Sequence, residues 1–207
     1  MKTFDTYLFD FDGTLVDSHD SLVKVFEGSY ASVGVKVPEG YVIRLMRIPL
    51  RQGYDELNAP QDDESLKVFE KNIIALLDEE EVLRLTKVYE DTMPMLFRLS
   101  NRGARLGIVT SNNVKHVNDV LRHLNIDEKL FSVIIGNNET KKHKPNPDPI
   151  YKALEVLGIS KDGVCYVGDA LDDKRAAINA GVTPVLLDRH QEYEKEDGIV
   201  IHSLNEL

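Results

Sequence analysis

The second half of the chain alternates short apolar runs with amphipathic segments, and this alternation strongly constrains the fold. Four runs are typical of buried strands: residues 106–110, 133–135, 164–167 and 184–187. Residues 148–157 place apolar side chains at helical spacing, with Pro149 near the start and Gly158 as a stop. Alternation of this kind implies right-handed crossovers and a parallel sheet with helices on both faces.

The apolar run Tyr7 to Phe11 indicates one more buried strand, which we assign to the same sheet. From residue 17 to residue 87 the sequence shows helical periodicity and no convincing strand. We therefore predict an α/β protein with a Rossmann-like parallel sheet and a small all-α domain inserted after the first strand. The expected core is residues 1–16 with 88–207, and the expected helical domain is residues 17–87.

Composition narrows the range of partners. The 207 residues carry a formal net charge of -10, so neither nucleic acid nor an anionic membrane is an expected partner. No apolar run is as long as a membrane span, which favours a cytoplasmic protein. The single cysteine, Cys165, lies within an apolar run and is expected to be a small buried hydrophobe. His116 and His123 fall on a predicted helix and are expected to be solvated.

The first strand ends in two acids, Asp10 and Asp12, followed by Gly13. Because side chains alternate across a strand, the two carboxylates leave on the same face and repel each other unless a cation or a shared proton relieves them. A solvated Asp-Gly turn would have the same sequence. A calcium loop is excluded, because counting from Asp10 places Gly13 fourth and Ser21 twelfth, where such a loop needs glycine sixth and glutamate twelfth.

Polar residues also follow the other strands at the edge where open parallel sheets bind ligands. Thr110, Ser111 and Asn112 come after one strand and open a helix, whose N–H groups favour an anion. Gly168-Asp169 follows another strand, with Asp172 and Asp173 shortly after. Lys144 precedes that strand, in a stiff segment that contains two prolines.

Acids, a hydroxyl and a lysine at neighbouring strand ends suit phosphoryl transfer, which needs a nucleophile, a cation and fixed donors for the developing charge. Carboxylate oxygens without cysteine or histidine favour Mg²⁺ over zinc. No Gly-rich Lys-Ser/Thr loop is present, so the P-loop nucleotide hydrolases are excluded.

In their order and placement these motifs resemble the haloacid dehalogenase superfamily of phosphohydrolases, in the branch with a helical cap after the first strand. Within it the chain is most similar to phosphoglycolate phosphatases and related small-molecule phosphatases. The matching motifs are Asp10 to Thr14, Thr110, Lys144 with Pro145, and Gly168-Asp169 with Asp173.

The resemblance implies a role for each motif residue. Asp10 resembles the nucleophile that forms an aspartyl-phosphate, and Asp12 the general acid and base. Asp10, the backbone carbonyl of Asp12, and Asp169 resemble the Mg²⁺ ligands, with Asp173 acting through water. Asp172 remains a competing candidate for that last position. Thr110 and Lys144 resemble the groups that hold and neutralise the phosphoryl group.

Two other functions remain open. A sugar phosphomutase of the β-phosphoglucomutase type shares both acids, although Thr14 favours a phosphatase, and a non-catalytic ligand-binding protein could keep the same fold. Dehalogenases of the superfamily lack the acid found here at Asp12. The chain departs from the family at residues 89–91, where Tyr-Glu-Asp replaces the frequent Tyr-Pro-Gly, and at Arg47, where glycine is common.

Arg44, Arg47 and Arg51 form a basic cluster in an acidic protein. Such a cluster could bind a second anionic group of a small phosphate ester, although a solvated helix face would have the same sequence. The oligomeric state remains open between monomer and homodimer. We expect substrate contacts from six residues: Gly13, Thr14, Ser111, Asn112, Arg47 and Arg51.

Overall fold

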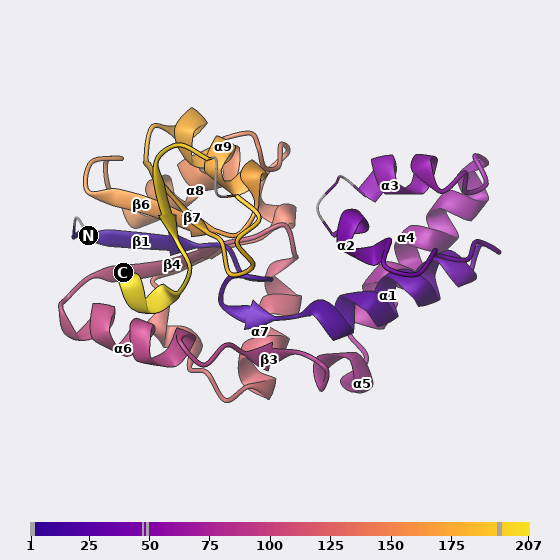
Figure 1. Cartoon of the computed structure of the whole chain (residues 1–207), viewed down its shortest axis with the longest axis horizontal. Coiled ribbons are helices and arrows are strands. Elements are labelled where there is room, and N and C mark those ends of the chain that lie inside the picture. The colour runs from indigo at the N-terminus through magenta and orange to yellow at the C-terminus, as the bar shows by residue number, and fades with distance from the viewer. Residues whose placement is uncertain (1–2, 47, 49, 194–195) are drawn as a thin grey trace. The chain divides into compact units, whose positions relative to one another are not determined.

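The computed structural model describes residues 3–46, 48, 50–193 and 196–207. The chain divides into two compact units (Figure 1): Met1–Asp17 with Val88–Leu207, and Ser18–Lys87. The first unit contains the sheet and the second is helical. Within the described ranges, no helix is both long enough and apolar enough to cross a membrane.

The first unit is built on a six-stranded sheet in the order β5-β4-β1-β6-β7-β8. All of its strand pairs are parallel, which confirms the predicted α/β fold. Sequence patterns did not indicate β8, which has three residues and only one buried side chain. The strands are β1 Thr6–Phe9, β4 Arg105–Val109, β5 Val133–Ile135, β6 Val164–Gly168, β7 Thr183–Leu187 and β8 Ile199–Ile201.

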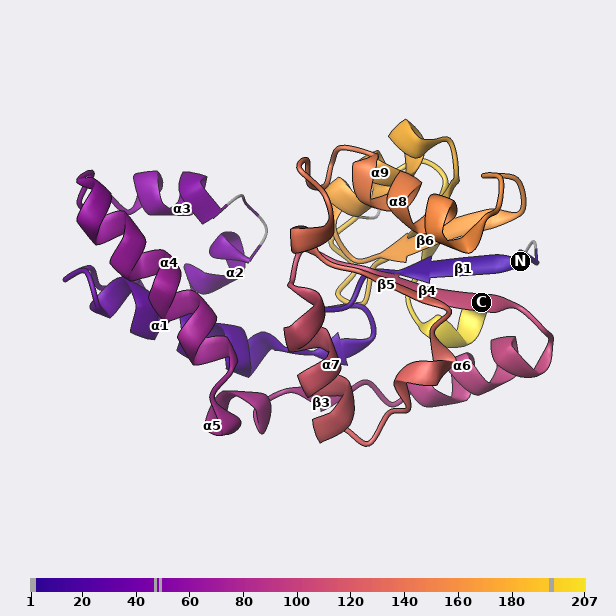
Figure 2. The ribbon, with the colours of Figure 1, turned by 180° about the vertical axis from the view of Figure 1, so that it is seen from behind.

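Helices cover both faces of this sheet. Figures 1 and 2 show α8 and α9 on one face and α6 and α7 on the other. Three short 3₁₀ helices complete the connections: η1 Glu128–Leu130, η2 Asn137–Glu139 and η3 Leu204–Glu206. The four α-helices are α6 Thr92–Asn101, α7 Val114–His123, α8 Asp148–Leu157 and α9 Leu171–Ala180.

One core cluster of this unit lies between the sheet and helices α8 and α9. Leu8, Ile150 and Ala153 are fully buried there, and each large aliphatic side chain contributes about 1.5–3 kcal/mol of stabilisation by leaving water. Cys165 on β6 is also fully buried, as predicted. Central parallel strands are buried on both faces, which explains why β1 and β6 read as continuous apolar runs.

The second unit is helical, and Tyr30, Tyr54 and Phe69 form the centre of its core. The Phe69 ring centroid lies 4.7 Å from that of Tyr30 and 4.8 Å from that of Tyr54, a spacing typical of packed aromatic pairs. Asp62 caps the start of helix α4, and its carboxylate accepts the Ser65 N–H at 2.8 Å. The helices are α1 His19–Ala31, α2 Val42–Leu45, α3 Leu50–Glu56, α4 Asp63–Leu77 and α5 Glu80–Leu83.

The chain passes between the units twice. The short strands β2 Val16–Asp17 and β3 Lys87–Val88 lie at these crossings and pair as a two-stranded sheet. The sequence contained no detectable signal for either, since a two-residue strand is too short to show a period.

Candidate active site

Three adjacent strands deliver the predicted polar residues to one edge of the sheet. Strand β1 lies between β4 and β6, and all three run parallel. Asp10 directly follows β1, and its N–H donates to the Val167 carbonyl at 2.8 Å. Thr110 follows β4 and Asp169 follows β6. The Thr110 N–H donates to the Ile135 carbonyl at 2.9 Å. The expected convergence of strand ends is therefore present.

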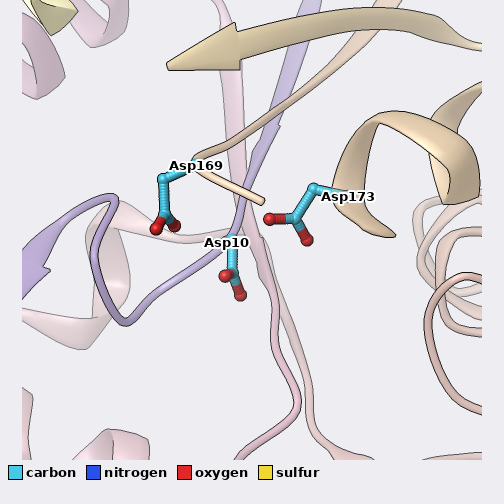
Figure 3. A group of neighbouring side chains, drawn as sticks. All are labelled: Asp10, Asp169 and Asp173. Atoms are coloured by element: carbon cyan, nitrogen blue, oxygen red, sulfur yellow. The ribbon is translucent and has the colours of Figure 1, made fainter. Parts of the chain in front are cut away.

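Three carboxylates gather at this edge, and we refer to Asp10, Asp169 and Asp173 as the acidic cluster. One oxygen of each lies within 4.8 Å of the others. Figure 3 shows the Asp173 carboxylate, from the first turn of α9, directed toward Asp10 and Asp169. Asp173 is 1% exposed and Asp10 is 8% exposed. The competing residue Asp172 instead pairs with Arg175 at 3.0 Å on the surface of α9.

Lys144 joins two members of the acidic cluster. Its Nζ lies 2.8 Å from Asp10 Oδ1 and 2.7 Å from Asp173 Oδ1. It also donates to the Tyr166 hydroxyl at 3.2 Å. The Lys144 side chain is only 7% exposed, so the ammonium ion is held in place by these three oxygens. Sequence reasoning predicted this lysine at the site, and the structure brings it there.

Tyr166 is a site residue that the sequence did not reveal. Its hydroxyl donates to the Val109 carbonyl at 2.7 Å and lies 3.1 Å from Asp173 Oδ1. Tyr166 belongs to the buried strand β6, two residues before Gly168, so both lie on the same face. A buried phenol requires a hydrogen-bond partner. This requirement was the one feature of the sequence that could have indicated a role for Tyr166 at the site.

The turn after β1 places two more predicted residues. Asp12 Oδ2 accepts a hydrogen bond from Asn112 Nδ2 at 2.5 Å. Thr14 is fully buried, and its Oγ1 donates to Asp169 Oδ1 at 2.9 Å. Gly13 has φ +74°, and a Cβ there would lie 2.4 Å from Asp169 Oδ2. Glycine is thus required both for its backbone conformation and for the close approach of Asp169.

The segment after β4 leads into α7 as predicted. The Asn112 N–H donates to Thr110 Oγ1 at 3.1 Å, and Asn113 caps the helix by accepting the His116 N–H at 2.8 Å. Ser111 is exposed at the start of this segment.

The expectation that His116 is solvated is wrong, because the residue is only 4% exposed. It lies beside Val117 and one turn before Val120, both buried, so it shares the inward face of α7. Among the described residues its Nδ1 has no hydrogen-bond partner.

Electrostatics at the acidic cluster favour a cation. Burial, reinforced by Asp173, raises the pKa of Asp10 well above its usual value, although Lys144 opposes the change. Burial and Asp173 also raise the pKa of Asp169 to about 6, against the hydrogen bond from Thr14. Burial lowers the pKa of Lys144, but Asp10 and Asp173 outweigh it and raise that pKa above its usual value. One ammonium ion therefore faces three carboxylates.

The residues present fit a hard divalent cation. All the donors of the acidic cluster are carboxylate oxygens, the ligands that Mg²⁺ prefers. Burial and, next, the charge of Asp173 raise the pKa values of Asp10 and Asp169, and a bound cation would offset both effects. The backbone carbonyl of Asp12 lies in the same turn and offers a further oxygen.

The cap arginines have partners within the helical unit. Arg44 pairs with Glu56 at 2.6 Å. Arg51 lies 3.1 Å from an oxygen of Asp55 and donates to Gln61 Oε1 at 2.7 Å. Arg47 lies outside the described residues. Contact of Arg47 or Arg51 with a substrate stays a prediction.

Comparison with known proteins assigns the chain to a family. The model of the haloacid dehalogenase-like hydrolase family matches residues 7–187. One relative carries the name pyrophosphatase PpaX and comes from Caldanaerobacter subterraneus subsp. tengcongensis. It is 32% identical over 86% of this chain and 79% of its own length. Phosphoglycolate phosphatase of Pasteurella multocida is 29% identical over 89% of this chain and 86% of its own.

A solved structure has a similar fold. The crystal structure of a haloacid dehalogenase-like hydrolase from Bacteroides fragilis superposes with a TM-score of 0.87 at 26% identity, covering 99% of this chain and 100% of that one. The chain belongs to the haloacid dehalogenase-like hydrolase family. The predicted family and the prediction of a hydrolytic enzyme are both confirmed.

Proposed function

We propose that the protein is a Mg²⁺-dependent phosphatase that hydrolyses a small phosphorylated metabolite through an aspartyl-phosphate on Asp10. One observation carries the proposal: Asp10 lies beside Asp169 and Asp173 and is paired with a buried Lys144 at 2.8 Å. This combination offers a carboxylate nucleophile, a cation site and a fixed positive charge within one cluster. Phosphoryl transfer needs these three elements.

In the first half-reaction a carboxylate oxygen of Asp10 attacks phosphorus, and the bond between phosphorus and the leaving oxygen breaks. Asp12 gives its proton to that oxygen. In the second half-reaction Asp12 takes a proton from water, the water oxygen attacks phosphorus, and the bond to Asp10 breaks to release phosphate. Asn112, at 2.5 Å from Asp12 Oδ2, holds the Asp12 side chain in place for both proton transfers.

Lys144 serves the same reaction without exchanging a proton. Its ammonium ion, fixed between Asp10 and Asp173, can neutralise charge on the phosphoryl oxygens. Asp10, the Asp12 carbonyl and Asp169 would hold Mg²⁺, with Asp173 acting through water. A bound Mg²⁺ supplies charge neutralisation at the transferring group.

We further propose that the substrate carries a second anionic group. The names of the relatives support this, since pyrophosphate and phosphoglycolate each have a second anion near the phosphoryl group. In a chain of net charge -10, an arginine of the cap, Arg47 or Arg51, would offset repulsion of such a substrate.

The test begins with an aryl phosphate in Mg²⁺ buffer, followed by a panel that includes phosphoglycolate and pyrophosphate. Hydrolysis should stop in excess chelator. It should also be inhibited by Ca²⁺, because calcium accepts bidentate carboxylates and would engage the attacking oxygen of Asp10. Full activity without a divalent cation, or no hydrolysis of any phosphate ester, would overturn the proposal.

A separate arm addresses the phosphomutase alternative. Purified protein receives a hexose 1-phosphate with a bisphosphate activator, and phosphorus NMR follows the products. Release of free phosphate faster than formation of the 6-phosphate is the result expected for a phosphatase, and the reverse order would make the protein a mutase. Binding of a phosphate ester with no turnover of any kind would indicate a ligand-binding protein.

A further inference from the structure

The Arg189 guanidinium connects two segments that are far apart in the sequence. Nη1 donates to Asp91 Oδ2 at 2.9 Å, and Nη2 donates to Asp91 Oδ1 at 3.0 Å. Nη2 also donates to the Thr14 carbonyl at 3.0 Å. The guanidinium carbon lies 3.8 Å from the centroid of the Tyr89 ring, within cation–π distance. Arg189 thus grips a carboxylate with both arms while holding the turn after β1.

Asp91 is itself firmly held. Its Oδ2 also accepts hydrogen bonds from Ser203 Oγ at 2.7 Å and from the Leu204 N–H at 2.9 Å. Burial raises the pKa of Asp91, but hydrogen bonds from Arg189, Ser203 and the Leu204 N–H outweigh it and lower the pKa below its usual value. The aspartate is therefore a fixed anchor, and Arg189 is oriented by an anchor that does not belong to the acidic cluster.

The turn after β1, which Arg189 holds at the Thr14 carbonyl, contacts the Asp169 carboxylate through Thr14 and Gly13. Thr14 Oγ1 donates to Asp169 Oδ1 at 2.9 Å, and Gly13 packs against the same carboxylate so closely that a Cβ would approach within 2.4 Å. A shift of the carbonyl of Thr14 therefore moves both contacts. Because Arg189 fixes the Thr14 carbonyl, a movement of Arg189 would also displace the Thr14 hydroxyl that holds Asp169.

We propose that Arg189 is a positioning residue, which holds the Thr14 turn so that Asp169 is oriented for the metal. This inference rests on the proposed function, because it assumes that Asp169 binds Mg²⁺. Asp91 makes the arrangement possible by holding the guanidinium in place. Arginine is required at position 189, because one planar fork must meet a carboxylate and a carbonyl at once, whereas lysine offers a single ammonium.

The experiment compares the parent with Arg189→Lys in Mg²⁺ binding, measured by calorimetry, and in the Mg²⁺ dependence of aryl phosphate hydrolysis. Loss of a residue that directly holds a metal ligand costs about 10–100-fold in affinity. Because Arg189 acts on Asp169 only through the Thr14 turn, we expect the Kd for Mg²⁺ to rise about tenfold, the lower end of that range. At saturating Mg²⁺, KM for the ester should stay within about twofold of the parent value, since Arg189 itself makes no contact with the acidic cluster and bound Mg²⁺ restores the position of Asp169. Arg122→Ala is the matched control, because it removes an exposed arginine paired with Asp119 on α7.

A second variant keeps the test valid if Arg189→Lys does not fold. Removing one partner of a buried pair leaves the other unpaired and costs about 3–5 kcal/mol. The double variant Asp91→Asn with Arg189→Gln removes both charges together and leaves neither ion unpaired. It should remain folded by circular dichroism and show the same rise in the Kd for Mg²⁺, because glutamine is too short to reach both the side chain at position 91 and the Thr14 carbonyl.

Thr14→Val tests the route of the effect. It removes the hydroxyl that holds Asp169 and leaves the carbonyl that Arg189 holds. If Arg189 acts through Thr14, combining Thr14→Val with Arg189→Lys should weaken Mg²⁺ binding no more than the stronger single change.

These measurements distinguish failure of the proposed function from failure of the positioning role of Arg189. A parent that neither binds Mg²⁺ nor hydrolyses phosphate esters contradicts the proposed function. A parent that does both, while folded Arg189 variants bind Mg²⁺ as the parent does, contradicts the positioning role alone. Fully additive losses in the Thr14 and Arg189 combination would also contradict it.

Discussion

The Asp173 carboxylate packs directly against the Cα atom of Gly168. A Cβ on residue 168 would lie 2.4 Å from Asp173 Cγ and 2.5 Å from its Cβ, far inside van der Waals contact. The φ of Gly168 is not in the left-handed region, so the glycine is required here for space rather than for backbone freedom. Strand β6 thus ends in a residue without a side chain so that an acid from α9 can reach the cluster.

Gly168→Ala should therefore displace Asp173 and separate it from Lys144. We expect a destabilisation of about 1–3 kcal/mol from overpacking and a loss of activity of about 100-fold, since a small misplacement of reacting groups costs that much. Urea unfolding and aryl phosphate hydrolysis measure the two effects. Gly28→Ala is the control, because its methyl group meets only the end of the Leu76 side chain. Normal activity in Gly168→Ala would show that the position of Asp173 is unimportant.

Asp10→Asn should abolish hydrolysis and preserve the fold. It replaces an anionic nucleophile with an amide of the same size, and burial already raises the pKa of Asp10, so the neutral side chain suits its surroundings. Trapping of a beryllium fluoride adduct should succeed with the parent and fail with the variant, while both melt cooperatively. Normal turnover by Asp10→Asn would refute the assignment of the nucleophile.

Lys144→Met should lower stability in a way that Mg²⁺ partly restores. Without the ammonium ion, Asp10 and Asp173 are left buried without their shared partner, a change that costs about 3–5 kcal/mol. A divalent cation at the acidic cluster would replace the missing charge, so the free energy of unfolding should recover in Mg²⁺ while activity does not. Lys152→Met, which alters a half-exposed lysine on α8, is the control. Equal stability of Lys144→Met with and without Mg²⁺ would place the cation elsewhere.

Cys165 should be inert in the folded protein. The residue is fully buried on β6, and burial raises the pKa of its thiol well above the usual value. Because the thiolate is the reactive form, Ellman's reagent should react with one thiol per chain in urea and with none in native buffer. Rapid reaction under native conditions would mean that β6 opens, since this strand is central in the sheet.

The sequence allowed prediction of the sheet edge because the signals there are local. Each of Asp10, Thr110 and Asp169 directly follows an apolar run, and parallel strands bring their carboxyl ends together without any further information. Lys144 has a weaker local signal, because the lysine lies in a loop rather than at a strand end, and the family resemblance supplied its role. The choice between Asp172 and Asp173 depends on which face of α9 turns inward, which the short helix did not reveal.

Other features depend on contacts between distant residues and were not predictable. Asp91 and Arg189 are 98 residues apart, and each looks like an ordinary surface charge in the sequence. Tyr166 was assigned to an apolar strand, since its hydroxyl finds partners only once β4 and α9 are in place. The burial of His116 was missed for a related reason: a polar residue on the inward face of a helix does not break the apolar pattern around it.

Arg51 is a cap residue that we expect to take part in substrate recognition. We propose that the core residues bind only the phosphoryl group that all phosphate esters share, so discrimination between esters would require a group elsewhere. Arg51 is exposed, and its present partners are the exposed Asp55, the side chain of Gln61 and the Tyr54 ring, whose centroid lies 5.7 Å from the guanidinium carbon. Exposed pairs of this kind are worth about 0–1 kcal/mol, so an anionic substrate could readily replace them.

We expect Arg51→Ala to raise KM about tenfold for a substrate with a second anion, such as phosphoglycolate, because one charge-assisted contact is lost. KM for an aryl phosphate should hardly change, as that ester has no second anion. Arg84→Ala is the matched control, since Arg84 is an exposed arginine of the same unit that pairs with Glu80 at i,i+4 spacing. Steady-state kinetics on both substrates give the comparison. An equal effect of Arg51→Ala on both substrates, or on neither, would exclude Arg51 from recognition of the second anion.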